Sequence, residues 1–281
     1  MPSEQAHIIR RQILHVDVQG MESDGLVVQR KLPLLCQNDL SAMLEDVLDQ
    51  AVAPDEHVII ERLDIEAGSF LLEHLEHDLA AAVSAALQKA LRERYITASS
   101  STANGVQRRT AGQSVQEAFL CFLGSGHLPW WFHVPPGRTL EELAIESWDR
   151  QGETDSIPHS FVGTLADAIR SEQVRKRLIL QFSLSFQTRV LDAISPQGSR
   201  IWQKVLASNH GAALPRVVEL FLQRISDAAL SRAMTGESVE ADILIAECWH
   251  ALPQTERQAP ELVTYLRQHA PELLVQLEPH T

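Results

Sequence analysis

The chain has 281 residues, of which 44% are hydrophobic and 22% are charged. This length and composition are typical of a folded globular protein with one large or two modest domains, and they exclude general intrinsic disorder. The formal net charge of −13 opposes binding to the phosphates of nucleic acids or to anionic membranes, so neither partner is expected.

The N-terminal domain, residues 1–97, is predicted to have the order β-α-β-α. Apolar and polar residues alternate in the segment 7–18, which is typical of a half-buried strand. Leucines then recur at helical spacing over 26–52, a second strand is expected over 57–65, and a long helix over 71–96. Two strands cannot bury both faces of a sheet, so we expect the helices to cover one face and a subunit or partner to cover the other.

The rest of the chain is predicted to consist of a linker and a helical domain. Residues 98–113 belong to a stretch rich in Ser, Thr, Gly and Ala without apolar periodicity, which indicates a flexible linker. Residues 114–281 are expected to form an all-helical domain of short helices, because apolar residues follow the helical period in bursts punctuated by prolines. The fold class is therefore α+β, mostly α-helical. The bursts cover 115–123, 139–148, 161–169, 172–194, 198–207, 214–234, 239–251 and 255–277.

One segment of the helical domain, residues 178–190, has a pattern that is compatible with either helix or strand. Apolar and polar residues alternate from Leu180 to Phe186, which is the period of a strand. A lone strand in a helical domain has no partner, so we favour two short helices with a break, the second capped by Ser183 or Ser185 and running to Ile194.

Sequence motifs for catalysis are absent. The common phosphate-binding, zinc-hydrolase, nucleophile-elbow and EF-hand patterns do not occur, so no catalytic, cofactor-binding or metal-binding residues are expected. His74 and His77 lie one helical turn apart but are expected to be solvated. Cys248 and His250 would point to different helix faces, so a buried thiol is the favoured interpretation of Cys248.

Positive charge is concentrated in one part of this acidic chain. Residues 170–232 contain 10 basic and 4 acidic side chains, a net charge of +6. Such a block indicates docking between segments or with a partner, although a solvated helix face bearing Arg175, Lys176 and Arg177 is the more common explanation.

The most distinctive segment is AFLCFLGSGHLPWWF, residues 118–132, in which a short apolar helix is followed by Pro129, Trp130, Trp131 and Phe132. Adjacent aromatic residues on an extended backbone point in different directions, so one can enter the core while the other meets a neighbouring molecule. These four residues are either a plug at the start of the helical domain or an interaction site for another protein, in which tryptophan is a preferred anchor.

Four segments carry a resemblance to a known family. HIIRRQILHVDV, IIERLDIEAGSF, LEHDLAAAVSAALQKALRERY and AFLCFLGSGHLPWWF, which lie between residues 8 and 132, resemble the tape-measure protein family of contractile injection systems. That family includes components of extracellular phage-tail-like particles such as the antifeeding prophage. The helical remainder resembles it in its leucine-rich texture.

The resemblance implies a structural assembly protein without catalysis that sets or caps the length of an inner tube. Its implied partners are inner-tube and baseplate proteins, in an oligomeric or multi-copy assembly, with residence in the cytoplasm during assembly and then within the particle. No transmembrane segment is expected, because glycines and prolines interrupt the longest uncharged stretch. At ~1.5 Å per residue, even a fully helical chain of this length would reach only about 420 Å, which favours an end module. The alternative is a helical adaptor or chaperone for tube or effector components.

Overall fold

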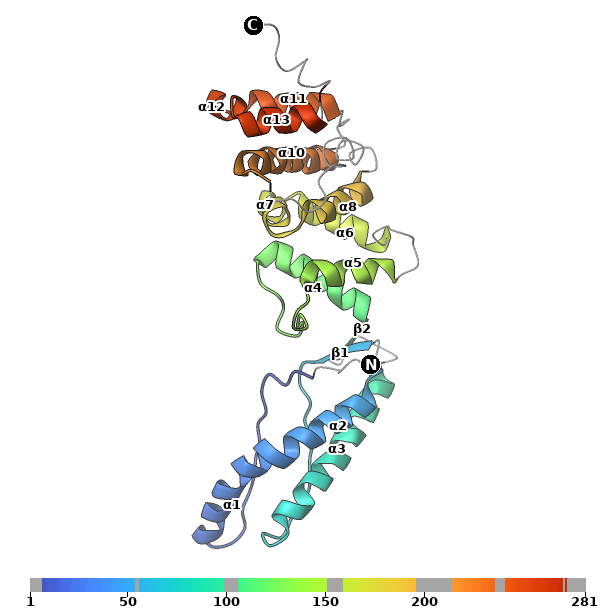
Figure 1. Cartoon of the computed structure of the whole chain (residues 1–281). Coiled ribbons are helices and arrows are strands. Elements are labelled where there is room, and N and C mark those ends of the chain that lie inside the picture. Colours follow the sequence, from blue (N-terminus) through green and yellow to red (C-terminus); the bar gives the residue numbers. More distant parts are fainter. Residues whose placement is uncertain are drawn as a thin grey trace. The chain divides into compact units, whose positions relative to one another are not determined.

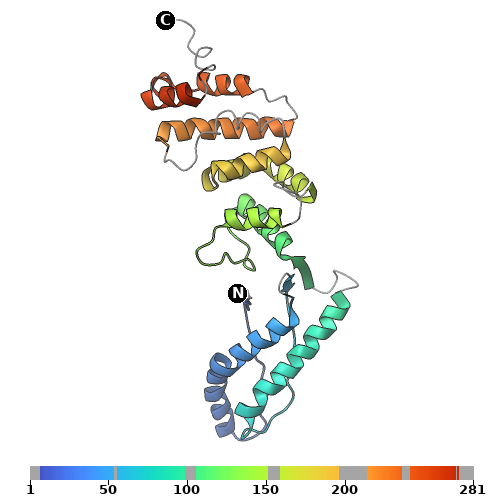
Figure 2. The same ribbon diagram turned by 45° about the vertical axis from the view of Figure 1, so that its right-hand side comes forward.

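The computed structural model describes residues 7–53, 56–98, 106–150, 159–195, 214–235, 241–269 and 271. Most of these residues are helical, and the sheet among them has two strands (Figures 1 and 2). The predicted class, mostly α with some β, is confirmed. The chain divides into two compact units, Met1–Ser114 and Val115–Thr281, which we call unit 1 and unit 2.

Unit 1 contains a long helical run that lies along a second long helix, as both views show (Figures 1 and 2). The run consists of α1 (Glu22–Leu35), the π-helix η1 (Cys36–Leu40) and α2 (Ser41–Ala51), and its partner is α3 (Leu75–Ala98). Pro33 lies just before the π-helix, and it lacks the N–H that would continue the α-helical hydrogen bonds.

Apolar stripes hold these helices together. The buried residues of the first run are spaced seven, five and seven residues apart, and the five-residue step spans the π-helix, whose turn is wider than an α-helical turn. On α3 every fourth residue is buried. The two sets of buried residues are Val28, Leu35, Leu40 and Val47 on the first run and Leu75, Leu79, Val83, Leu87 and Leu91 on α3.

The sheet of unit 1 is an antiparallel pair of β1 (Glu56–Ile60) and β2 (Val106–Thr110). Glu56 lies opposite Thr110, and Ile60 lies opposite Val106. Arg108 forms a bidentate ion pair with Glu56 diagonally across the ladder, with Nε 2.5 Å from Oε1 and Nη2 3.0 Å from Oε2. The expected strand over 57–65 is therefore present over its first part.

The expected first strand was wrong. Residues 7–18 have no regular secondary structure, and side chains 8–18 are exposed. The alternating pattern identifies a chain that can be extended, but a strand also needs a neighbour that satisfies its backbone N–H and C=O groups. In the described part of unit 1, β1 has β2 as its ladder partner.

The flexible linker expected over 98–113 was also wrong wherever the structure describes it. Residue 98 ends α3, Val106–Thr110 is β2, and Ala111 begins α4, while residues 99–105 lie outside the described residues. The sequence pattern did not predict β2, because this strand has one apolar residue, Val106. It is held by backbone pairing with β1 and by the ion pair of Arg108 with Glu56.

Unit 2 is built from helices stacked in layers, with α10 packed against five others, α6, α7, α8, α11 and α13 (Figures 1 and 2). The expected helix over 198–207 and the end of the last one lie outside the described residues. The helices are α4 (Ala111–Ser125, which begins in unit 1), α5 (Leu140–Asp149), α6 (His159–Ile169), α7 (Glu172–Gln181), α8 (Leu184–Ile194), α10 (Arg216–Thr235), α11 (Ala241–His250), α12 (Gln254–Arg257) and α13 (Pro260–His269).

The ambiguous segment consists of two helices with a break, as predicted. α7 ends at Gln181, and the Ser183 hydroxyl caps α8 by accepting a hydrogen bond from the N–H of Phe186 at 3.2 Å. The buried amide of Gln187 donates to the carbonyl of Phe182 at 2.9 Å, and its oxygen accepts from the Ser226 hydroxyl at 2.9 Å. A backbone carbonyl group that the break leaves without a helical partner thereby accepts a hydrogen bond inside the protein.

An aromatic cluster forms one end of the unit 2 core. Phe119 of α4 is fully buried, and its ring lies edge-on to Trp148 of α5 at 6.1 Å between centroids, to Phe182 at 5.3 Å and to Phe186 at 5.5 Å. Trp148 and Phe186 stack at 5.1 Å. These contacts join α4, α5 and the break between α7 and α8.

We predict that the sheet of unit 1 loses stability in acid through His57. Burial lowers the pKa of His57 from 6.5, and the positive charge of Arg109 lowers it further; Nδ1 lies 2.7 Å from the Ser114 hydroxyl. The unfolded chain binds a proton more readily, so stability is complete above about pH 6.5 and falls as the pH drops below that value. Hydrogen exchange of the β1 and β2 amides at pH 7.5 and 5.5 should show this loss of protection. The same loss in His57→Gln would contradict it.

Candidate interaction loop

The predicted interaction residues lie on the connection between α4 and α5, residues 126–139. Trp130 is 47% exposed, and Pro129, Trp131 and Phe132 are half-buried. The N–H of Phe132 donates to the carbonyl of Pro129 at 3.0 Å, which closes a turn, and the rings of Trp131 and Phe132 meet edge-on at 6.1 Å. We call residues 129–132 the Trp loop.

The Trp loop lies apart from the hydrophobic core. In the part of unit 2 that the structure describes, the core and its partly buried neighbours come from the helices, the Phe182 and Leu252 breaks and the flanking Leu214 and Ala259, and include none of residues 129–132. A plug function would bring at least one indole into that core. The interpretation of these residues as an interaction site stays a prediction.

The entry to the loop is held by a sharp end to α4. Gly126 has φ +82°, which favours glycine, and its N–H donates to the carbonyl of Phe122 at 2.8 Å. The hydroxyl of Ser125 donates to the carbonyl of Cys121 at 2.8 Å and accepts from the N–H of His127 at 3.1 Å. The last turn of the helix and the first residues of the loop thus share one hydrogen-bond network.

Arg177 of α7 reinforces this entry. Its guanidinium donates to the carbonyl of Leu123, one of the carbonyl groups left without an intrahelical donor at the end of α4. It also lies against Gly126, where an added Cβ would come within 3.3 Å of Arg177 Nε. A side chain 54 residues away in sequence therefore fixes where the loop leaves the helix.

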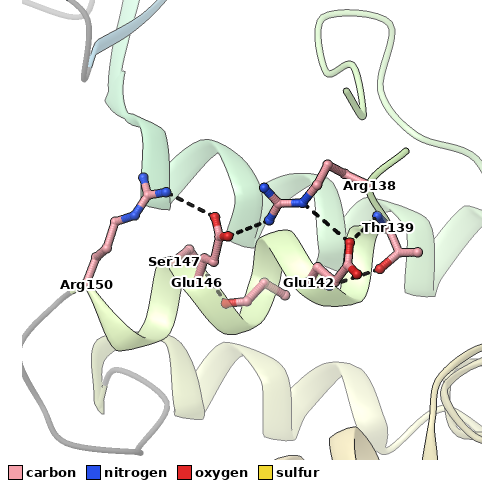
Figure 3. A network of polar contacts seen from close by, with 7 residues as sticks. Arg138, Thr139, Glu142, Glu146, Ser147 and Arg150 are labelled. Atoms are coloured by element: carbon pink, nitrogen blue, oxygen red, sulfur yellow. Dashed lines mark hydrogen bonds and ion pairs between the residues drawn. The ribbon is translucent and has the colours of Figure 1, made fainter. Parts of the chain in front are cut away.

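The exit from the loop is held by a chain of alternating charges on α5 (Figure 3). Gly137 has φ +75° and turns the backbone toward the helix. The guanidinium of Arg138 lies between two carboxylates, with Nη2 2.5 Å from Glu146 Oε1 and Nε 3.4 Å from Glu142 Oε2. Arg150 completes the chain by donating to the other oxygen of Glu146 at 3.0 Å.

A capping box begins α5 at the same place (Figure 3). The N–H of Glu142 donates to the Thr139 hydroxyl at 3.2 Å, and the N–H of Thr139 donates to the Glu142 carboxylate at 2.9 Å. The hydrogen bond from the Thr139 N–H lowers the pKa of Glu142, and Arg138 lowers it further. Thr139 followed three residues later by Glu142 is a signal that sequence reasoning missed, whereas nothing in the local sequence indicates the role of Arg177.

The basic block has several separate uses within unit 2. Arg175, of which the side chain is 12% exposed, pairs with Asp227 of α10 at 2.8 Å. Arg189 of α8 pairs with Asp149 of α5 at 2.6 Å, and Arg177 caps α4. Lys176 has the solvated position expected of a helix surface and pairs with Glu172 of its own helix at 2.6 Å. Docking between segments therefore accounts for much of the block.

The other residues considered from sequence have surroundings without convergent chemistry. His74 and His77 are exposed, and the described residues contain no group of three side chains suited to hold a metal ion. Burial raises the pKa of the Cys248 thiol to about 11, which makes it a poor nucleophile. A hollow of about 260 Å³ between α2 and α3 has Arg92 as its charged lining residue and is otherwise lined by Val47, Gln50, Ala51, Gln88 and Leu91. Among the described helices, none is long and apolar enough to cross a membrane.

A family match covers both units. The family model of the contractile injection system tape measure protein matches residues 6–280. The chain belongs to this family. The match extends the resemblance seen over residues 8–132 through the helical unit. Searches of the curated proteins and of the solved structures found no significant match.

Family membership gives this tape-measure protein a structural role in a contractile injection system, through interaction with other components of the particle. Such a role favours a function without catalysis. A component of an assembly needs surfaces that other proteins recognise, and the Trp loop is a candidate for such a surface.

We predict that the loop entry depends on Gly126. Gly126→Ala should lower the free energy of unfolding of unit 2 by about 1 kcal/mol or more, because an alanine is strained at positive φ and its Cβ meets Arg177. All five tryptophans follow residue 114, so urea unfolding monitored by tryptophan fluorescence reports on unit 2.

Gly124→Ala is the matched control for this substitution. Gly124 lies in α4 and an added Cβ meets nothing within 4 Å, so an alanine there should stabilise by up to about 1 kcal/mol. Equal effects of the two substitutions would show that the backbone at Gly126 carries no special constraint.

Proposed function

We propose that this tape-measure protein acts as an end module that sets or caps the length of the inner tube, with the Trp loop as a docking contact. The family match over residues 6–280 carries the proposal. The finer assignment to an end module draws on helix length. The longest described helix, α3, has 24 residues and therefore spans only about 36 Å.

The breaks between helices and their packing support an end module over a continuous rod. Breaks at Phe182 and Pro253 separate helices that a rod would need to be continuous, and α10 packs against five neighbouring helices. In a chain that folds back on itself in this way, helices pack side by side and add little to its length. An extended ruler would leave the same apolar faces without partners along its length.

The proposed partners are inner-tube and baseplate proteins. Trp130 provides an exposed indole next to the edge-on pair of Trp131 and Phe132, held between two well-anchored helix ends. A rigid aromatic group loses little conformational freedom on binding, so its burial contributes strongly to affinity. The protein is proposed to be present in several copies, in the cytoplasm during assembly and then in the particle.

The double substitution Trp130→Ala/Trp131→Ala is expected to impair particle assembly while unit 2 stays folded. Particle yield is measured by sedimentation and electron microscopy, and folding by circular dichroism of the purified chain. Leu180→Ala, which removes another exposed apolar side chain of unit 2, is the control and should leave assembly intact. Global unfolding of the double variant would identify the indoles as core residues, and normal particle yield would exclude the docking function.

Internal shortening is expected to leave tube length unchanged or to prevent particle formation. In-frame deletions remove α13 alone and then residues 241–269, and electron microscopy measures the tubes that form. A ruler would shorten the tube in proportion to the deleted length, so proportional shortening would contradict the end-module proposal.

The alternative, a helical adaptor or chaperone, differs in where the protein is found. An end module copurifies with the mature sheathed particle. A chaperone is present in immature lysate and absent from the finished particle, and that distribution would overturn the structural assignment in favour of the chaperone.

A further inference from the structure

The N-terminal segment 8–18 exposes an unusual amount of apolar surface. All of its side chains are exposed, although six of its eleven residues are apolar. The six are between 39% and 57% exposed: Ile8, Ile9, Ile13, Leu14, Val16 and Val18. None of them belongs to the hydrophobic clusters found among the described residues of unit 1. Six exposed apolar side chains within eleven residues indicate a binding surface.

The segment is held extended at both ends. His7 Nε2 lies 2.7 Å from Asp49 Oδ1 on α2, and the N–H of Met21 donates to the Asp24 carboxylate at 2.9 Å where α1 begins. The segment between these anchors belongs to no strand. An extended backbone that is already fixed at its ends loses less conformational freedom when a second strand pairs with it.

A second extended segment of unit 1 has the opposite charge. Residues 61–66 continue the chain directly from β1, and all but Leu63, which packs against the α2–α3 cluster, are exposed. This segment has three acidic residues and one basic residue, a net charge of −2, whereas residues 8–18 have two basic and one acidic, a net charge of +1. The sheet of the described residues consists of β1 and β2 and includes neither segment.

We propose that residues 8–18 form a β-strand with residues 61–66 of a second copy of this chain. Each copy provides one basic and one acidic segment, so two copies can pair reciprocally in a closed, two-fold arrangement. Arg10 and Arg11 then project from opposite faces of the added strand, as Glu61 and Glu66 do from the acidic segment, so each face has a basic and an acidic side chain. Apolar residues of the strand meet Ile65, which is 38% exposed. The added strand pairs with the stretch that directly follows β1 and so lengthens the sheet past the end of that strand.

Charge reversal in two separate chains tests whether the pairing is between copies. In the full-length chain, Arg10→Glu/Arg11→Glu and Glu61→Lys/Glu66→Lys each place like charges together, twice in a symmetric dimer. Sedimentation velocity should show self-association of the wild-type chain, and each variant alone should associate at least about tenfold more weakly. An equimolar mixture of the two variants should recover association, because each contact in the mixed dimer again joins opposite charges.

The mixture separates this proposal from its competitors. Pairing within one chain, or association through another surface, gives no recovery on mixing, and a wild-type chain that stays monomeric leaves the segment to a different protein. Each of these results overturns the proposal. The test uses the isolated chain, so its failure is distinguishable from failure of the end-module function, which is measured on particles.

A backbone substitution gives an independent measurement. Leu14→Pro removes an N–H from the proposed ladder and should weaken association, whereas Leu14→Thr keeps the N–H and a residue suited to strands and should retain most of it. Circular dichroism checks that both chains are folded. Equal association of the two variants would show that the contact involves no strand pairing.

Discussion

Burial of the Phe119 ring is the interaction that fixes how α4 and α5 pack against the break between α7 and α8, at one end of unit 2. One fully buried ring from α4 contacts aromatic rings from α5 and from the break between α7 and α8. These contacts bring α7 close enough for Arg177 to reach the end of α4, and they hold α5 against α4 through Trp148. The Trp loop has its ends on α4 and α5, so its position is a consequence of the core even though its own residues lie outside it. Aromatic side chains are few in this chain, and several of them are concentrated here. A small number of residues therefore holds α4, α5 and the break between α7 and α8 together.

Sequence periodicity predicted the long helices well because each of them buries an apolar face against a neighbour. The alternation from Leu180 to Phe186 looked like a strand because a helix break occurs within it, with Leu180 exposed and Phe182 and Phe186 buried. Strands were predicted less well. Pairing depends on where another segment lies, which no local pattern contains, so β2 was missed and the segment 7–18 was assigned to a strand without a ladder.

The candidate site was predictable in its aromatic residues and unpredictable in its supports. Trp130 and Trp131 stand out in any reading of the sequence. Their supports include Arg177 of another helix and the carboxylate of Glu146, two turns into α5, and these interactions exist only in the folded chain. The capping box at Thr139 is a local motif and marks the start of α5. The entry to the loop is thus fixed by Arg177, which is distant in sequence, and the exit is marked by the local capping box at Thr139.

The π-helix between α1 and α2 limits how the helical pair of unit 1 can change in length. The buried residues on its two sides face α3 in phase only because one wide turn absorbs the five-residue step. Removal of a single residue there would leave a four-residue step, which a regular α-helical turn keeps in phase, whereas removal of one residue between Ser41 and Asp46 of α2 would rotate the rest of that helix by about 100° and turn Val47 away from α3. Lengthening that keeps both stripes in contact has to add complete turns to both helices together, in increments of about 5.4 Å. Size variation in this part of the molecule is therefore quantised.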